Sequence, residues 1–167
     1  MNASDAITLF AYNRWANERI LSAAERVPAE RLIAPYPCLS HGSLHGTLAH
    51  CLAAEVVWLQ RMRDGVSPAA LPEASAVPTL AALRARWAQV EGEWQAYLGT
   101  LADDALAQPV HYRTTAGREM ATPLWHILTH VVLHGMQTRA EAALALTAYG
   151  CSPGDIDWIV YARSVPG

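Results

Sequence analysis

The sequence predicts an all-α fold, a four-helix bundle with a small hairpin or irregular insert before the last long helix. Four long segments carry apolar residues at helical spacing, and no comparable run of strands accompanies them. One of these segments, residues 122–149, also carries histidines at a spacing of four residues. Helices that each bury one face pack into bundles, where metal and cofactor sites form from side chains on facing helices.

The composition favours one well-packed domain spanning residues 1–167, which is long enough to build a core without disulfides or a structural metal. Hydrophobic residues make up 52% of the chain and charged residues 16%, and this balance excludes a disordered chain. All twelve cationic residues are arginine. Chemistry that needs a lysine nucleophile is therefore excluded.

Charge and hydropathy also limit the expected partners. The net charge is −3 and the arginines are scattered, so the chain lacks the basic stripe that tracks a phosphate backbone, and we expect no nucleic acid partner. The N-terminal stretch has no cationic leader, and no apolar run approaches the roughly 20 residues of a membrane span. We therefore expect no membrane contact and a cytoplasmic location. The cysteines, which form no CxxC pair, are expected to be free thiols: Cys38, Cys51 and Cys151.

The first three long helices are predicted from apolar spacing and from the breakers between them. Prolines and a glycine interrupt regular structure between the first two helices, and three prolines predict a long loop before the third. Polar residues at the helix starts are candidate caps. The predicted segments are residues 5–27 with Ser4 as cap, a short helical turn within 28–32, residues 44–63, and residues 80–101 with Thr79 as cap.

The last third of the chain is predicted to contain a β-hairpin, the fourth long helix and a short final helix. Alternating residues on both sides of the turn-like sequence TTAG predict the hairpin. The fourth helix has Thr122 as a candidate cap, Pro123 at its first position and Gly150 as its stop. A short helix over residues 153–163 follows.

Three of the seven histidines share one face of the fourth long helix. His126, His130 and His134 recur every four residues, which stacks side chains one turn apart. The apolar residues between them require this helix to be largely buried. Buried neutral imidazoles need partners, and a metal ion or a carboxylate supplies one. His50 lies in the second long helix, so ligands from two helices can converge. The alternative is that these histidines are packed, hydrogen-bonded core residues.

Several segments are similar to those of a known family. Residues 130–139, HVVLHGMQTR, follow an H-x3-H-x3-H-R signature except at Thr138, and residues 42–50, GSLHGTLAH, open the second long helix with a matching sequence. On these residues the chain resembles the DinB/YfiT-like family over nearly its whole length. The further matching segments are residues 12–17, 54–55, 58–61 and 149–157.

The resemblance implies a four-helix bundle, often a homodimer, that binds a divalent metal ion, zinc or nickel, through one histidine of the second long helix and two of the last. His50 matches the first ligand position and His134 a position in the second cluster, whereas Thr138 replaces the last histidine of the signature. A threonine hydroxyl is a poor ligand for these metals. His130 is therefore expected to bind with His134, and the alternative is an incomplete site that binds metal weakly.

Other polar residues are candidates for supporting roles. Glu55 lies five residues after His50 and is our candidate catalytic residue, as a general base or as a partner of a metal ligand. Arg139 and Glu141 are further candidates of this kind. The alternative is a structural ion pair between helices. Tyr12 and Trp15 are expected to be core aromatics, His126 to be peripheral, and His41, His45 and His111 to lie at the surface or in loops.

The resemblance implies a metal-dependent enzyme that acts on a small molecule, with hydrolase-like or thiol S-transferase chemistry. In the transferase version a metal ion lowers the pKa of a low-molecular-weight thiol, and in the hydrolase version it activates water. A second hypothesis is a non-catalytic metal- or ligand-binding bundle, a stress-related dimer with a degenerate site. A third is a structural interaction protein that buries aromatic faces between subunits.

Overall fold

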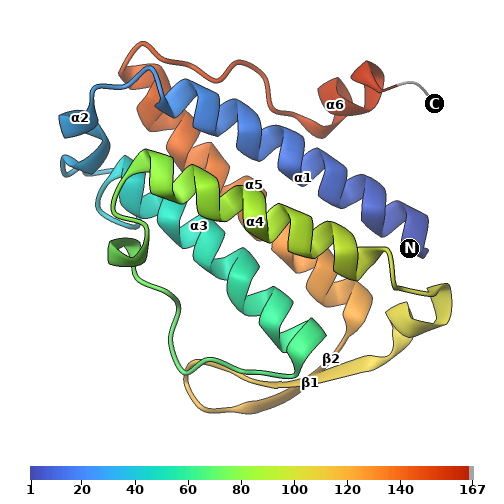
Figure 1. The fold of residues 1–167 in the computed structure, drawn as a ribbon. Helices are drawn as coiled ribbons and strands as arrows, with labels where there is room; N and C mark the ends of the chain where they lie inside the picture. Colours follow the sequence, from blue (N-terminus) through green and yellow to red (C-terminus); the bar gives the residue numbers. More distant parts are fainter. Residues whose placement is uncertain (166–167) are drawn as a thin grey trace.

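Four long helices form the bundle in the computed structural model, which describes residues 1–165 (Figure 1). Both α3 and α1 pack against α5, and α4 packs against the same two helices. The predicted all-α bundle is confirmed. In the described residues, every helix is too short or too polar to cross a lipid bilayer. The long helices are α1 (Ala3–Ala24), α3 (Leu44–Leu59), α4 (Leu80–Leu98) and α5 (Leu124–Ala148).

Shorter elements close the ends of the bundle. The π-helical turn η1 extends α3, and Figure 1 shows the hairpin β1–β2 crossing the end of the bundle where α3 finishes and α5 begins. The two strands pair antiparallel, with Pro109 opposite Pro123, so the predicted hairpin is confirmed. These elements are α2 (Ala29–Ile33), η1 (Gln60–Asp64), η2 (Ala74–Ala76), η3 (Asp103–Ala107), β1 (Pro109–Arg113), β2 (Glu119–Pro123) and α6 (Trp158–Ser164).

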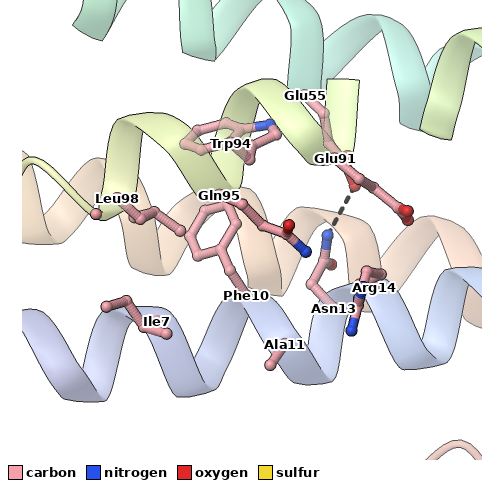
Figure 2. Close-up of a pocket in the computed structure, with 11 residues that line it drawn as sticks. Ile7, Phe10, Ala11, Asn13, Arg14, Glu55, Glu91, Trp94, Gln95 and Leu98 are labelled. Atoms are coloured by element: carbon pink, nitrogen blue, oxygen red, sulfur yellow. Dashed lines mark hydrogen bonds between the residues drawn. The ribbon is translucent and has the colours of Figure 1, made fainter. Parts of the chain in front are cut away.

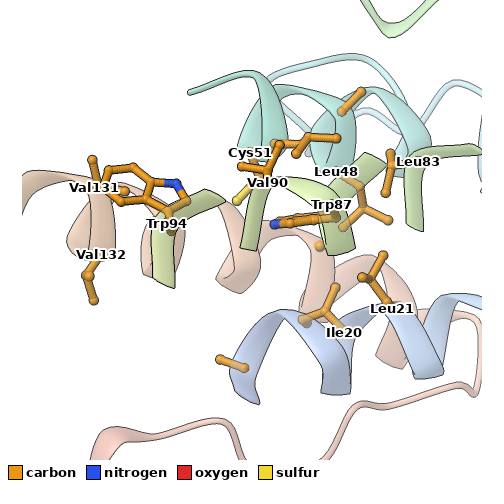
Figure 3. Packing of buried hydrophobic residues seen from close by; sticks show 14 of the residues in the cluster. Ile20, Leu21, Leu48, Cys51, Leu83, Trp87, Val90, Trp94, Val131 and Val132 are labelled. Carbon is orange, nitrogen blue, oxygen red and sulfur yellow. The ribbon is translucent and has the colours of Figure 1, made fainter. Parts of the chain in front are cut away.

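The core lies between the four long helices and is filled from α4 by two indoles (Figure 3). Trp87 packs among aliphatic side chains of α1 and α3, and Trp94 lies against Phe10 with ring centroids 4.4 Å apart. Aromatic side chains of this size bury about 150–250 Å² each. The three cysteines are free thiols, as predicted. Burial raises the pKa of Cys51 to about 12, so this thiol is inert.

The predicted start of the last long helix was wrong. Thr122 lies in β2 opposite Val110, and Pro123 precedes the helix, where it contributes no side-chain cap. The strand ladder fixes Thr122 in extended backbone. The first helical residue, Leu124, donates its N–H to the carbonyl of Gln108, so the hairpin and not a side chain sets where α5 begins.

Two other helix starts also differ from prediction. The cap of α1 is Asn2, whose side chain accepts from the N–H of Asp5, because the pair forms a capping box that Ser4 cannot make. The last helix starts at Trp158 instead of residue 153. The segment before it is irregular and is held against α1, because the hydroxyl of Tyr12 donates to the carbonyl of Ile156 at 3.0 Å.

Candidate functional site

Two histidines from different helices face each other at the centre of the candidate site. His50 on α3 and His134 on α5 bring their Nε2 atoms to 3.3 Å. In a tetrahedral zinc site with Zn–N bonds of about 2.0–2.1 Å, two ligand nitrogens lie roughly 3.3–3.4 Å apart. The separation of these two nitrogens therefore matches the distance between two ligand nitrogens of such a site, and the pair fits a divalent ion.

The electrostatics of the site favour neutral imidazoles. Burial lowers the pKa of His50 to about 4, with His41 and His134 adding to the effect and Glu141 opposing it. Burial also lowers the pKa of His134, with smaller effects from His130 and His41, and it lowers the pKa of His130. Metal ions bind the neutral form of histidine. At neutral pH the ring nitrogens of this group are therefore available as ligands.

The third predicted ligand lies next to this pair without completing a metal site. The His130 ring centroid is 5.7 Å from that of His134, and its ring stands edge-on to Trp58 at 5.3 Å. Within residues 1–165, no three His, Cys, Asp or Glu side chains are arranged to hold a metal ion. The Thr138 hydroxyl donates to the carbonyl of His134 at 3.0 Å and is engaged by the backbone. The role of His130 as a ligand stays a prediction, and His126, which is exposed, lies outside this group.

A fourth histidine, His41, joins the group from the loop before α3. Its ring stacks on that of His50 with centroids 3.7 Å apart. Glu141 on α5 holds this loop, because its carboxylate accepts hydrogen bonds from the backbone N–H and the hydroxyl of Ser40, both at 3.0 Å. Sequence reasoning placed His41 in a surface loop. It is exposed, but it also covers one face of a predicted ligand.

The histidines open into a cavity of about 260 Å³ between α3, α5 and the hairpin. The volume suits a ligand of a few heavy atoms, since sites for drug-sized molecules run from about 300 Å³ upward. Aromatic and apolar side chains form much of its wall. Besides the three histidines, the lining includes Trp58, Arg61, Leu71, Tyr112, Thr114 and Thr115.

Comparison with known proteins agrees with this architecture. Residues 1–165 match the model of the DinB family. The chain belongs to the DinB family. It is also 22% identical to Protein DinB of Bacillus subtilis (strain 168) over 166 residues, which cover 93% of this chain and 92% of that protein. The DinB match spans both helices that carry the facing histidines, so the resemblance inferred from the sequence is confirmed at the level of the family.

In this DinB chain the candidate catalytic residue, Glu55, lies in the core and does not line the histidine cavity. It is 2% exposed, and its carboxylate accepts three hydrogen bonds, from Asn13 at 2.8 Å, Asn17 at 3.1 Å and Trp87 at 3.0 Å. Arg139, 1% exposed, donates to the side-chain oxygens of both asparagines at 2.6 and 2.7 Å. The side-chain amides of the two asparagines thus link the buried carboxylate of Glu55 to the buried guanidinium of Arg139.

The pattern of donors around Glu55 suits a carboxylate, because every contact is donated to it. Burial raises the pKa of Glu55, while the hydrogen bonds of Asn13 and Asn17, the charge of Arg139 and the indole N–H of Trp87 oppose that rise. This placement favours the structural alternative, a buried pair that joins α1, α3 and α5. The general-base role stays a prediction.

Glu55 instead reaches a second cavity, of about 210 Å³, between α1 and α4 (Figure 2). Phe10, Trp94 and Leu98 give this cavity apolar walls. Burial raises the pKa of Glu91, also in the lining, to about 7, and the nearby charge of Glu55 adds to the rise.

Position 135 must be glycine because the hydrogen-bonded side chains of Arg139 and Asn13 pass close to its backbone. A Cβ added there would lie 2.8 Å from Nη1 of Arg139 and 2.9 Å from Oδ1 of Asn13. We expect Gly135→Ala to destabilise the fold by about 1–3 kcal/mol, although alanine is the better helix former. Gly92 on α4 is the matched control, because nothing lies within 4 Å of its added Cβ. Gly92→Ala should stabilise by roughly 0.5–1 kcal/mol in urea unfolding. Equal effects of the two changes would contradict this interpretation.

Two histidine predictions have opposite outcomes. His45, expected at the surface or in a loop, is buried, and its Nε2 lies 2.8 Å from the carbonyl of Val77. The reason is that His45 lies in the first turn of α3 and its ring meets Val77, the residue directly after η2, in the long segment between η1 and α4. His111 is exposed on β1, as predicted.

Sequence reasoning also missed Arg61. This residue follows His50 by eleven positions, which is close to three helical turns and places both on the same face. Ala54, Val57 and Trp58 lie on that face between them, and all line the histidine cavity. The spacing was a usable signal for Arg61.

Proposed function

We propose that this DinB-family chain is a divalent-metal-dependent enzyme that acts on a small molecule in the histidine cavity, by hydrolase-like or thiol S-transferase chemistry. The observation that carries the proposal is the 3.3 Å separation of the facing Nε2 atoms of His50 and His134, beside a cavity of ligand size. In the proposal His130, which lines the same cavity, would supply the third nitrogen. Zinc and nickel, which bind imidazole readily, are the proposed metals.

The chain's own residues would bind and orient the small molecule. His50 and His134 would hold the ion, which would supply the Lewis acidity that lowers the pKa of a thiol or of water. Trp58 and Tyr112 present aromatic surfaces to the substrate and exclude water from one side of the cavity. The loop that carries His41 covers His50 on its other side.

A second candidate function is a non-catalytic metal- or ligand-binding bundle. It is favoured by Thr138, whose hydroxyl is engaged by a backbone carbonyl at the position where a third histidine was expected. A site with two histidine ligands binds metal more weakly than one with three. This alternative keeps the cavity and its ligand but not the reaction.

Assays with and without a thiol separate these possibilities. Zinc- or nickel-loaded protein is mixed with a chromogenic ester, or with an aromatic chloride plus a low-molecular-weight thiol. Thiol transfer forms a carbon–sulfur bond and releases chloride, and hydrolysis consumes water and cleaves the ester without thiol. We expect one of the two reactions to be lost on chelation and in His134→Ala. Rates that equal those of the chelated protein in both assays would support the non-catalytic alternative.

We further propose a homodimer. An apolar stripe on the outer face of α5 supports it, since exposed patches of this kind commonly mark interaction surfaces. A cytoplasmic location stays a prediction. The exposed residues of the stripe are Trp125, Leu133, Met136 and Leu144.

A further inference from the structure

Arg61 is a buried cation without a counter-charge. It lies in η1, it is 7% exposed, and within residues 1–165 it takes part in no ion pair. Its Nη2 donates to the carbonyl of Arg113 at 3.2 Å, and its Nε has no acceptor among the described residues. Burying a charge with an unused donor is unfavourable, and a ligand that accepts a hydrogen bond there would offset the cost.

Two aromatic rings hold the guanidinium in place. Its central carbon lies 4.6 Å from the ring centroid of Trp58 and 5.2 Å from that of Tyr112. Contact with aromatic faces is favourable for arginine and is compatible with in-plane hydrogen bonds from the guanidinium N–H groups. The indole of Trp58 also stands edge-on to His130, so Arg61 and the histidines lie along the wall of one cavity.

The charges of the lining define the ligand. Arg61 is the one arginine among the described residues that line the cavity, and no Asp or Glu lines it. Arg61 is thus the one permanently charged side chain of the lining, and its planar fork of N–H donors matches the two oxygens of a carboxylate. A carboxylate neutralises this charge, whereas a phosphate monoester, with about −1.5 to −2 charge, leaves negative charge unpaired.

We propose that Arg61 binds the carboxylate of a small monocarboxylic acid in the histidine cavity, with the rest of the molecule extending toward His50 and His134. This inference rests on the proposed function only for the reaction that would follow binding of the acid. The binding step itself needs neither metal nor catalysis. In the thiol-transfer version the thiol or its acceptor would carry the carboxylate.

The test uses the full chain after chelation of metal, with propionate as the probe and propionamide as its neutral counterpart of the same shape. Binding is followed by the indole N–H signal of Trp58, assigned from the spectrum of Trp58→Phe. We expect propionate to shift this signal at concentrations where propionamide does not. Arg61→Gln should weaken propionate binding at least about 10-fold, because a hydrogen bond to a charged group is lost.

Arg63→Gln is the matched control, since Arg63 lies two residues away and pairs with Asp64 and Glu93 at the surface. It should bind propionate like the wild type. Equal binding of propionate and propionamide, unchanged affinity in Arg61→Gln, or tighter binding of inorganic phosphate would each overturn the assignment. If Arg61→Gln does not fold, the comparison of the two probes in the wild type still decides. Because metal is removed first, failure of the proposed metal site leaves the result unaffected.

Discussion

Replacing Glu55 by glutamine is expected to destabilise the fold by about 3–5 kcal/mol, the range for breaking a buried charge pair. Glutamine has one side-chain oxygen, whereas Glu55 accepts from two amides at one oxygen and from an indole at the other. An N–H of the new amide would therefore face another donor. Arg139 would also keep its buried charge without a compensating carboxylate. Urea unfolding of the purified variant measures the loss.

The double variant Glu55→Gln/Arg139→Met separates charge from packing. Removing both charges should leave the protein more stable than the single Glu55→Gln variant, because Arg139 is then no longer a buried cation without the Glu55 carboxylate. Glu30→Gln, at an exposed position of α2, is the control and should change stability by less than about 0.5 kcal/mol. A Glu55→Gln variant as stable as this control would show that Glu55 is not an ionised member of the network. That result would favour the hypothesis that Glu55 is a general base.

The second large effect is expected at the facing histidines. His50→Ala or His134→Ala should lower zinc affinity at least about 100-fold, because each removes one of two nitrogens already at ligand spacing. His130→Ala should lower it by a smaller factor, and full zinc occupancy in that variant would remove His130 from the ligand set. His126→Ala is the control, since His126 is exposed and does not line the cavity. Zinc should also raise the melting temperature of the wild type and not that of His134→Ala.

Most of the fold followed from local sequence signals. The long helices came from apolar spacing, and the hairpin came from alternation around TTAG. The errors lie where tertiary contacts override local signals. Thr122 reads as a helix cap, but strand pairing with Val110 holds it in β2. Residues 153–157 read as helix, but the segment is irregular and Tyr12 holds it by a hydrogen bond to the carbonyl of Ile156.

The candidate site was less predictable. His50 and His134 were paired through resemblance to a family, because spacing within one helix says nothing of which residues on another helix they meet. His41 could not be foreseen, since the hydrogen bonds of Glu141 to a distant loop bring it onto His50. Arg61 could have been found from its spacing to His50. Its stacking on Tyr112 of the hairpin could not.

The metal content of the wild-type chain is the most direct measurement. The protein is incubated with a slight excess of zinc, dialysed against metal-free buffer and analysed for bound metal, with His134→Ala treated in parallel. We expect about one zinc ion per wild-type chain and far less in the variant. Equal, low zinc in both proteins would contradict a metal site formed by His50 and His134, and the histidine cavity would then be a site for an organic ligand alone.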